Sequence, residues 1–227
     1  MNKRKLTYTV LIMISAIILV DQLVKFLVKT HMFIGEDIPL IGEWCRLHFV
    51  ENEGFAFGTS FGGVTGKYIL TLFRIVASVA IGWYVTRLIR KGGRTSLTLS
   101  LSCILAGAIG NIIDCLFYGL IFGESYYTVA SLFPPEGGYA PLMQGRVVDM
   151  FYFPLFEGVF PQWMPFVGGN HFEFFSAIFN FADSAITIGV IWLIIDLLLN
   201  EKSRSADSAD EKKYNFKQLI ARFKEKK

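Results

Sequence analysis

The sequence predicts an all-α integral membrane protein, with four transmembrane helices and a small β-rich extracytoplasmic cap. Of its 227 residues, 53% are hydrophobic and 18% are charged, and the mean hydropathy is +0.46. This balance excludes an ordinary soluble domain. Four apolar segments are long enough to cross a hydrocarbon core, which takes about 20 helical residues. They are Tyr8 to Val28, Tyr68 to Ile89, Leu97 to Ile121 and Ser176 to Leu199.

The basic residues predict that both termini are cytoplasmic, because Lys and Arg in short flanking loops favour that side. Sixteen of the 22 Lys and Arg residues precede the first segment, separate the second from the third, or follow the fourth. The connections at about 29–67 and 122–175 therefore face outward, and residues 1–200 form one membrane domain. The net charge of +3 reflects this asymmetry and does not indicate nucleic-acid binding.

The first segment resembles a signal peptide but lacks a small-x-small cleavage site, so we interpret it as a permanent anchor. Asp21 lies about 21 Å along it at 1.5 Å per residue, which places this acid in the outer leaflet. Lys25 is one turn further on and can pair with Asp21. Both a structural ion pair and direct chemistry are open for these two residues.

The first outer connection combines a strand-like stretch from Trp44 to Asn52 with a small-residue stretch that follows it. Gly54 and Ala56, next to Phe57, allow the backbone to lie close to another chain or to a lipid-buried helix. By itself, Asn52 is better read as an ordinary turn residue.

The second segment carries Arg74, for which we expect an ion pair or a headgroup contact. The third has Gly107 and Gly110 on a small-residue face that permits close helix packing. Its Asn111 and Asp114 lie about 21 to 26 Å along the axis, at the depth of Asp21. The three cysteines form no disulfide or metal pattern.

The second outer connection contains a strand-like stretch, Gly145 to Phe153, which we expect to dip toward the membrane. Its Asp149 is a candidate partner for Asp183, although read alone it could be a solvated loop acid. An ionisable Asp183 within the fourth segment is costly in hydrocarbon and is therefore a functional candidate. Its polar neighbours could equally well hydrogen-bond adjacent helices; they are Asn180, Ser184 and Thr187.

Residues 201–227 are predicted to be cytoplasmic and to lie outside the membrane domain. A polar linker comes first. Four apolar residues then recur at helical spacing among lysines, as in a basic amphipathic helix on an anionic leaflet; they are Phe216, Leu219, Ile220 and Phe223.

The carboxylates suggest a hydrolytic apparatus that needs no metal and no cofactor. Two carboxyl groups held together in a low-dielectric site share one proton, so one can act as a base on water while the other donates to a carbonyl. The sequence offers no Ser/His/Asp set and no cluster of zinc ligands. The alternative is a small proton-coupled transporter whose carboxylates form a relay. A transporter should show a second, inward-facing polar vestibule.

Five motifs resemble, in order, those of the bacterial lipoprotein signal peptidases, also called signal peptidase II. They are Asp21-Gln22-x-x-Lys25, Asn52-x-Gly54-x-Ala56-Phe57, Gly110-Asn111-x-x-Asp114, Val147-Val148-Asp149 and Phe179-Asn180-x-Ala182-Asp183. The resemblance implies an aspartic endopeptidase of the bacterial inner membrane, with Asp149 and Asp183 as its catalytic pair near the outer leaflet. The implied supporting residues are Asp21, Lys25, Asn52, Gly54, Ala56, Phe57, Asn111, Asp114 and Asn180.

The same resemblance implies the substrate, a diacylglyceryl-modified prolipoprotein cut just before its lipid-bearing cysteine, with membrane lipids as the other partner. The oligomeric state is left open. The third motif usually ends in Asp-Arg, whereas here Cys115 takes the place of the arginine. Arg146 could supply the missing cation to Asp149, or it could be a solvated loop charge. The segments around Asp149 are longer than in compact family members.

Overall fold

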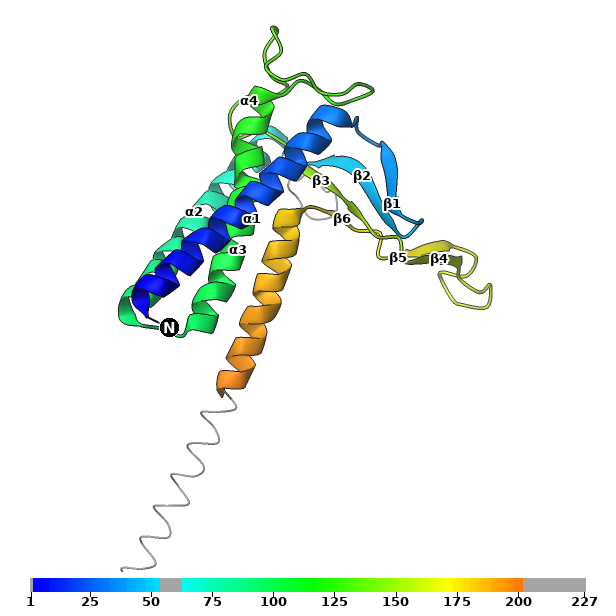
Figure 1. The fold of residues 1–227 in the computed structure, drawn as a ribbon. Helices are drawn as coiled ribbons and strands as arrows, with labels where there is room; N and C mark the ends of the chain where they lie inside the picture. Colours follow the sequence, from blue (N-terminus) through cyan, green and yellow to red (C-terminus); the bar gives the residue numbers. More distant parts are fainter. Residues whose placement is uncertain (1, 54–62, 202–227) are drawn as a thin grey trace, which may run out of the picture.

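The computed structural model describes residues 2–53 and 63–201 and shows four long helices with a small sheet at one end (Figure 1). Three of them are α1 (Lys3–His31), α2 (Gly63–Lys91) and α3 (Thr95–Ile113). Helix α3 continues through a π-helical turn, η2 (Asp114–Tyr118), and α4 (Gly119–Ile121). The last helix is Phe181–Glu201. All four are long and apolar enough to cross a membrane, as the sequence predicts.

Helix α3 forms the centre of the bundle. Its most apolar stretch is 56% buried, against 17% in each of the other three helices. The predicted small-residue face allows this packing. A Cβ added at Gly107 would lie 2.3 Å from the carbonyl oxygen of Ala182, and one at Gly110 would lie 2.6 Å from Oδ2 of Asp21. Glycine at these two positions lets α3 approach α1 and the last helix this closely.

The sheet has four antiparallel strands in the order β1-β2-β3-β6. They are β1 (Asp37–Ile41), β2 (Cys45–Asn52), β3 (Val147–Tyr152) and β6 (Ile178–Phe179). Strands β2 and β3 confirm the two predicted strand-like stretches. Their register places Val50 opposite Asp149. Strands β4 (Phe156–Val159) and β5 (His171–Phe174) form a separate hairpin that projects away from the helices (Figure 1).

A buried apolar cluster fixes the sheet to the helices. Phe49 from β2 and Val148 and Met150 from β3 are completely buried. They pack against the end of α1 and against Tyr118 and Phe122, which lie at the end of the α3 extension. Burial of such side chains stabilises each by about 1.5–3 kcal/mol. Strand β3, which carries Asp149, is therefore held rigidly over the bundle.

The last helix begins at Phe181, not at Ser176 as the sequence suggested. Residues Ile178–Phe179 are instead drawn into the sheet as β6, paired with β3. Asn180 then caps the helix, because its Oδ1 accepts a hydrogen bond from the Asp183 amide at 2.8 Å. Asp183 therefore lies in the first turn of the helix, and Asn180 precedes the helix. Hydropathy alone does not show this cap.

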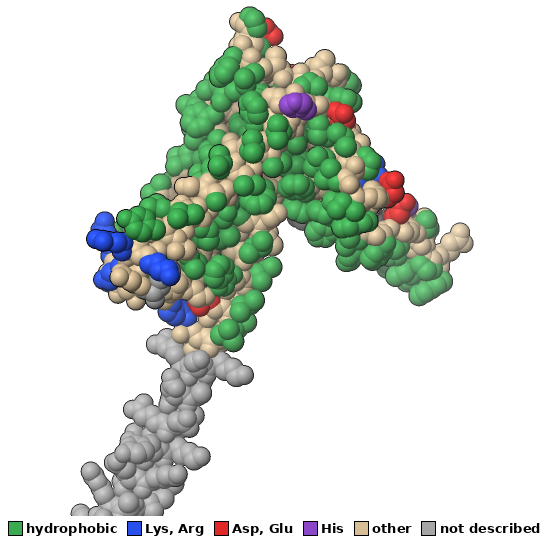
Figure 2. Space-filling model, viewed as in Figure 1, with side chains coloured by type: hydrophobic (Ala, Val, Ile, Leu, Met, Phe, Trp, Pro, Cys, Tyr) green, Lys and Arg blue, Asp and Glu red, His purple; other side chains and the backbone are tan. Residues whose placement is uncertain are grey.

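The basic end of the bundle lies opposite the sheet. Figure 2 shows Lys and Arg side chains gathered near the N-terminus, while hydrophobic side chains cover the helices. There Lys3 donates to the Arg90 carbonyl at 2.7 Å, and Arg94 pairs with Asp196 at 3.2 Å. Some predicted features lie outside the described residues: the supporting residues Gly54, Ala56 and Phe57, and the linker and amphipathic tail at 202–227.

Candidate active site

A buried ion cluster joins α1 to α3. Lys25 contacts Asp21 at 3.0 Å and Asp114 at 2.7 Å, and all three side chains are 0% exposed. The predicted pairing of Asp21 with Lys25 is thus present, with Asp114 as a second partner. Gln22 ties the two acids together by donating to Asp114 at 2.9 Å and to Asp21 at 3.1 Å. Buried charges need such partners, because an unpaired one is costly.

The same cluster reaches the last helix and the sheet. One oxygen of Asp21 accepts a hydrogen bond from the Ala182 amide at 2.8 Å, which satisfies a free N–H at the start of that helix. One oxygen of Asp114 accepts from the Val148 amide of β3 at 3.3 Å. The ion cluster therefore sets the positions of both elements that carry the predicted catalytic acids.

Two asparagines connect this cluster to Asp149 and Asp183. Asn111 accepts from Lys25 at 2.8 Å and donates to Asp183 at 2.8 Å. Asn180 donates to Asn111 at 3.1 Å and to Asp149 at 2.6 Å. The two predicted catalytic acids are therefore the ends of one continuous hydrogen-bonded chain, and each is oriented by an amide that is itself held.

Asp149 lies in an environment that favours its protonated form. It is 4% exposed, and burial together with the negative charge of Asp183 raises the pKa of Asp149 to about 7. Hydrogen bonds from Asn180 and Asn52, the latter at 3.3 Å, act in the opposite direction. Near neutral pH, Asp149 is therefore a carboxyl group that can either hold or release a proton.

Asp183 differs from Asp149 in its hydrogen bonding. One of its oxygens accepts from Asn111 at 2.8 Å, and the other faces the Asn180 amide at 3.4 Å. An amide and a carboxylate that bond reciprocally across three residues form a capping box. Two carboxyl groups in different hydrogen-bond surroundings, with one raised pKa, form an arrangement typical of a paired acid and base.

Comparison with known proteins decides the family. The model of the signal peptidase (SPase) II family matches residues 13–199. The chain belongs to the signal peptidase II family. A lipoprotein signal peptidase of Porphyromonas gingivalis is 48% identical over 206 residues, which cover 88% of this chain and 89% of the relative. One of Amoebophilus asiaticus is 35% identical over 182 residues, which cover 79% of this chain and 73% of that one.

Solved structures agree with this assignment at the level of the fold. A bacterial membrane enzyme determined by the in meso method at 2.3 Å superposes with a TM-score of 0.56 at 24% identity, covering 86% of this chain and 90% of that one. A second, at 1.9 Å, gives a TM-score of 0.53 at 26% identity and covers 84% and 92% of the two chains. The membership does not favour the transporter alternative.

An arginine other than Arg146 lies beside Cys115. Nη1 of Arg74, on α2, lies 3.4 Å from Sγ of Cys115. Arg146 lies elsewhere, because its guanidinium is bonded to Glu51 at 2.8 Å and to Glu124 at 2.9 Å. The cation next to Cys115 therefore comes from α2, and the supporting role of Arg146 stays a prediction.

Sequence reasoning also missed two polar groups. The first is an ion pair between Lys29 and Glu51, both almost completely buried, in which Lys29 also donates to Ser125 at 2.7 Å. The pair links α1 to β2 and to the inserted connection. Lys29 lies one turn beyond Lys25 on the same helix face, and this i,i+4 spacing was the available signal.

The second missed group is a polar stripe on α2 that includes Arg74. Lys67, Thr71 and Ser78 are buried, and Arg74 is partly buried between them. The spacing i, i+4, i+7 and i+11 puts all four on one helix face. Polar residues at helical spacing within a membrane segment are expected to face protein, so the pattern was readable from sequence.

Proposed function

We propose that the chain is an aspartic endopeptidase that removes signal peptides from diacylglyceryl-modified prolipoproteins, with Asp149 and Asp183 as the catalytic pair. One observation carries the proposal. Two acids from different elements, a strand and a helix start, are joined through Asn180 and Asn111 into one network. The relatives in the family are lipoprotein signal peptidases, which supplies the substrate class.

The two acids would divide the chemistry according to their surroundings. Asp149, whose pKa is about 7, holds the proton and donates it to the oxygen of the scissile carbonyl. Asp183, whose oxygens face the N–H groups of Asn111 and Asn180, accepts a proton from the attacking water. The hydroxyl then bonds to the carbonyl carbon. Collapse of the tetrahedral intermediate breaks the C–N bond. The leaving nitrogen takes a proton from Asp183, and the hydroxyl formed from the carbonyl oxygen returns its proton to Asp149 as the carbonyl re-forms.

The surrounding charges would keep this pair in place through the reaction. Lys25 carries one positive charge against the two acids Asp21 and Asp114, so the cluster is a fixed set of charges next to the reacting groups. Fixed charges need no reorganisation when charge develops in the transition state. We propose that these residues position the catalytic acids and do not touch the substrate.

Arg74 would take over the part that an arginine has in the usual family motif. Cys115 is a small, weakly polar side chain, and the Arg74 guanidinium beside it restores a positive charge from the neighbouring helix. A guanidinium has a fork of N–H donors suited to a carbonyl or an anionic group of the substrate. The change at position 115 therefore relocates the cation instead of removing it.

The basic end of the bundle supports an orientation with both termini cytoplasmic and the sheet on the outer side. The catalytic acids lie at the sheet end, where the last helix starts (Figure 1). In this orientation they face the outer leaflet, which would hold the acyl chains of a lipid-modified substrate.

The test is cleavage of a prolipoprotein by the purified full chain. The lipid-modified precursor should be cut just before its cysteine, whereas a precursor without the lipid should not. Asp149→Asn and Asp183→Asn should each abolish cleavage while the helical circular dichroism stays unchanged, because an amide cannot share the proton. Full activity in either variant would refute the catalytic pair.

A further inference from the structure

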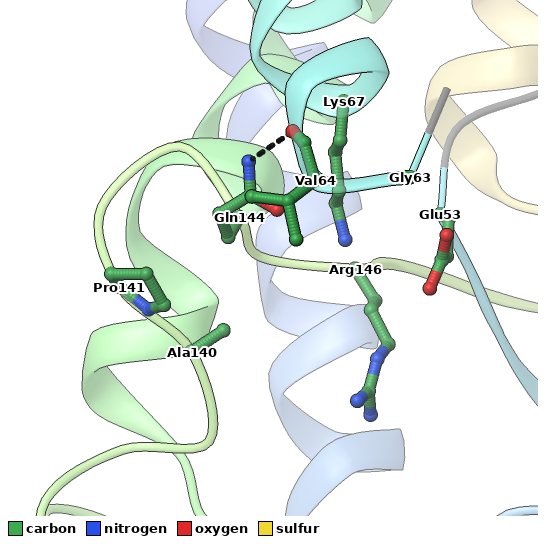
Figure 3. A pocket seen from close by; sticks show the side chains of 8 residues that line it. All are labelled: Glu53, Gly63, Val64, Lys67, Ala140, Pro141, Gln144 and Arg146. Carbon is green, nitrogen blue, oxygen red and sulfur yellow. Dashed lines mark hydrogen bonds between the residues drawn. The ribbon is translucent and has the colours of Figure 1, made fainter. Parts of the chain in front are cut away.

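A pocket of about 470 Å³ opens at the start of α2, and none of its lining residues belongs to the ion cluster or to the proposed catalytic pair. Its wall is formed by the first turns of α2 and by the end of the inserted connection, as Figure 3 shows. The lining residues are Glu53, Gly63, Val64, Lys67, Ala140, Pro141, Gln144 and Arg146. Its volume is that of a small-molecule site, which spans roughly 300–1,000 Å³.

Lys67 is the feature of this pocket that calls for a ligand. The side chain is only 5% exposed and lines the pocket. Within residues 2–53 and 63–201, no hydrogen bond or ion pair joins its ammonium to another group, although Glu53 is its principal anionic neighbour. Its neighbour Arg146, in contrast, is already bonded to two glutamates. A buried charge is costly unless an opposite charge accompanies it.

The backbone at this place adds to the positive potential. Helix α2 begins at Gly63 and runs for 29 residues. The N–H groups of its first turn have no partner within the helix, and the helix dipole is positive at this end. Phosphate groups bind readily at such helix starts. The Lys67 ammonium and the start of α2 therefore favour the same kind of ligand, a phosphate.

The position of the pocket favours a lipid as the source of that phosphate. Gly63 is also the end of the segment that is apolar enough to cross a membrane, so the pocket lies where lipid headgroups lie. Val64, which lines the pocket, is apolar and exposed, so acyl chains attached to the phosphate would pass over it into the hydrocarbon. A free phosphate would not use this contact.

We propose that this pocket binds the headgroup of a phospholipid, with the phosphate on Lys67 and the start of α2. Glu53 borders the pocket on the side away from Ala140 and Pro141 (Figure 3). Its carboxylate suits an ammonium group, so a phosphoethanolamine headgroup fits better than an anionic one without an amine. The proposal does not rest on peptidase activity.

The test measures lipid binding to the delipidated full chain in detergent by native mass spectrometry. Phosphatidylethanolamine should bind, and diacylglycerol with the same acyl chains, which lacks the phosphate, should bind far more weakly. Lys67→Gln should weaken phosphatidylethanolamine binding roughly ten- to hundredfold, since one charged hydrogen bond is lost. The matched control is Lys91→Gln, at the other end of α2, which should bind as the unmodified protein does.

Further measurements distinguish a lipid from free phosphate as the ligand, and the phosphate of the headgroup from its ammonium group. Lys67→Arg keeps the cation and should keep the binding, which controls for misfolding of Lys67→Gln. Glu53→Gln should weaken phosphatidylethanolamine more than phosphatidylglycerol, and equal effects would overturn the assignment of the ammonium. Binding of inorganic phosphate without binding of lipid would overturn the lipid source. Unchanged lipid binding in Lys67→Gln, or equal binding of diacylglycerol, would overturn the site itself.

Discussion

The raised pKa of Asp149 predicts how the rate depends on pH. Burial and the charge of Asp183 raise this pKa to about 7, while hydrogen bonds from Asn180 and Asn52 lower it. If Asp149 must carry the proton, kcat/KM should fall as pH rises through about 7, tenfold per unit well above it. Asn52→Ala removes one hydrogen bond to the charged form, so the pKa of Asp149 should rise and the alkaline limb should move to higher pH.

The size of the shift follows from the geometry. The bond from Asn52 to Asp149 is 3.3 Å long, longer than the usual 2.7–3.2 Å, so it is weaker than the roughly 1.5–3 kcal/mol of a good hydrogen bond to a charged group. About 0.7–1.4 kcal/mol corresponds to a shift of about half to one pH unit. The bond from Asn180 at 2.6 Å stays in place.

The assay is kcat/KM for a lipid-modified precursor between about pH 5 and pH 9, with Asn170→Ala as control. Asn170 lies in the distant β4–β5 hairpin, and its variant should keep the limb of the unmodified protein. The raised pKa of Asp149 should also make the stability of the fold depend on pH. Because the folded pKa lies above the unfolded value of about 3.9, Asp149 contributes stability at low pH that is lost as pH rises toward about 7. A limb that stays fixed, or moves to lower pH, in Asn52→Ala would refute the assignment of Asp149 as the proton donor.

Three further predictions concern the cation, the packing and the metal. Arg74→Gln should lower kcat/KM by about tenfold or more, since a charge-assisted bond is worth roughly 1.5–3 kcal/mol, and adding Cys115→Arg should restore much of the rate; a double variant as slow as the single one would contradict the relocated cation. Gly107→Ala should lower stability by about 1–3 kcal/mol in thermal unfolding, because its Cβ would meet the Ala182 carbonyl at 2.3 Å. Gly82→Ala is the control and should leave the stability unchanged, because its Cβ has an ordinary contact at 3.6 Å. Equal melting temperatures for Gly107→Ala and the unmodified protein would speak against the tight helix contact. Cleavage should survive a chelator, since residues 2–53 and 63–201 bring no three metal-binding side chains together; loss of turnover that zinc restores would overturn this.

Much of the site was predictable because polar residues within apolar membrane segments must face other protein groups, and so their positions indicate which residues lie together. Asp21 and Lys25 were expected to pair, and Asp114 was expected at the same depth; the three form one ion cluster. The strand carrying Asp149 was also expected, from its β-favouring residues. In both cases a local pattern determined the placement.

The parts that could not be predicted depend on contacts between distant segments. Ile178–Phe179 pair with β3, which moves the start of the last helix to Phe181, and no local signal separates such an apolar strand from a helix. Arg146 was one candidate for a cation beside Asp149, and its guanidinium is bonded to Glu51 and Glu124. Side chains three residues apart in an extended segment point to opposite faces, so sequence spacing did not indicate these two partners.

Because the last helix is capped by Asn180, the position of Asp183 does not depend on the length of the outer loop. Asp183 is placed by Asn180 three residues earlier and by the contact of Ala182 with Asp21, not by the segment between β3 and β6. Residues can therefore be added in the β4–β5 hairpin without moving Asp183. One residue inserted between Asn180 and Asp183 would instead rotate the acid by about 100° around the helix axis. The outer face is thus free to grow and diversify in this protein, whereas the four residues that start the last helix admit no change of length.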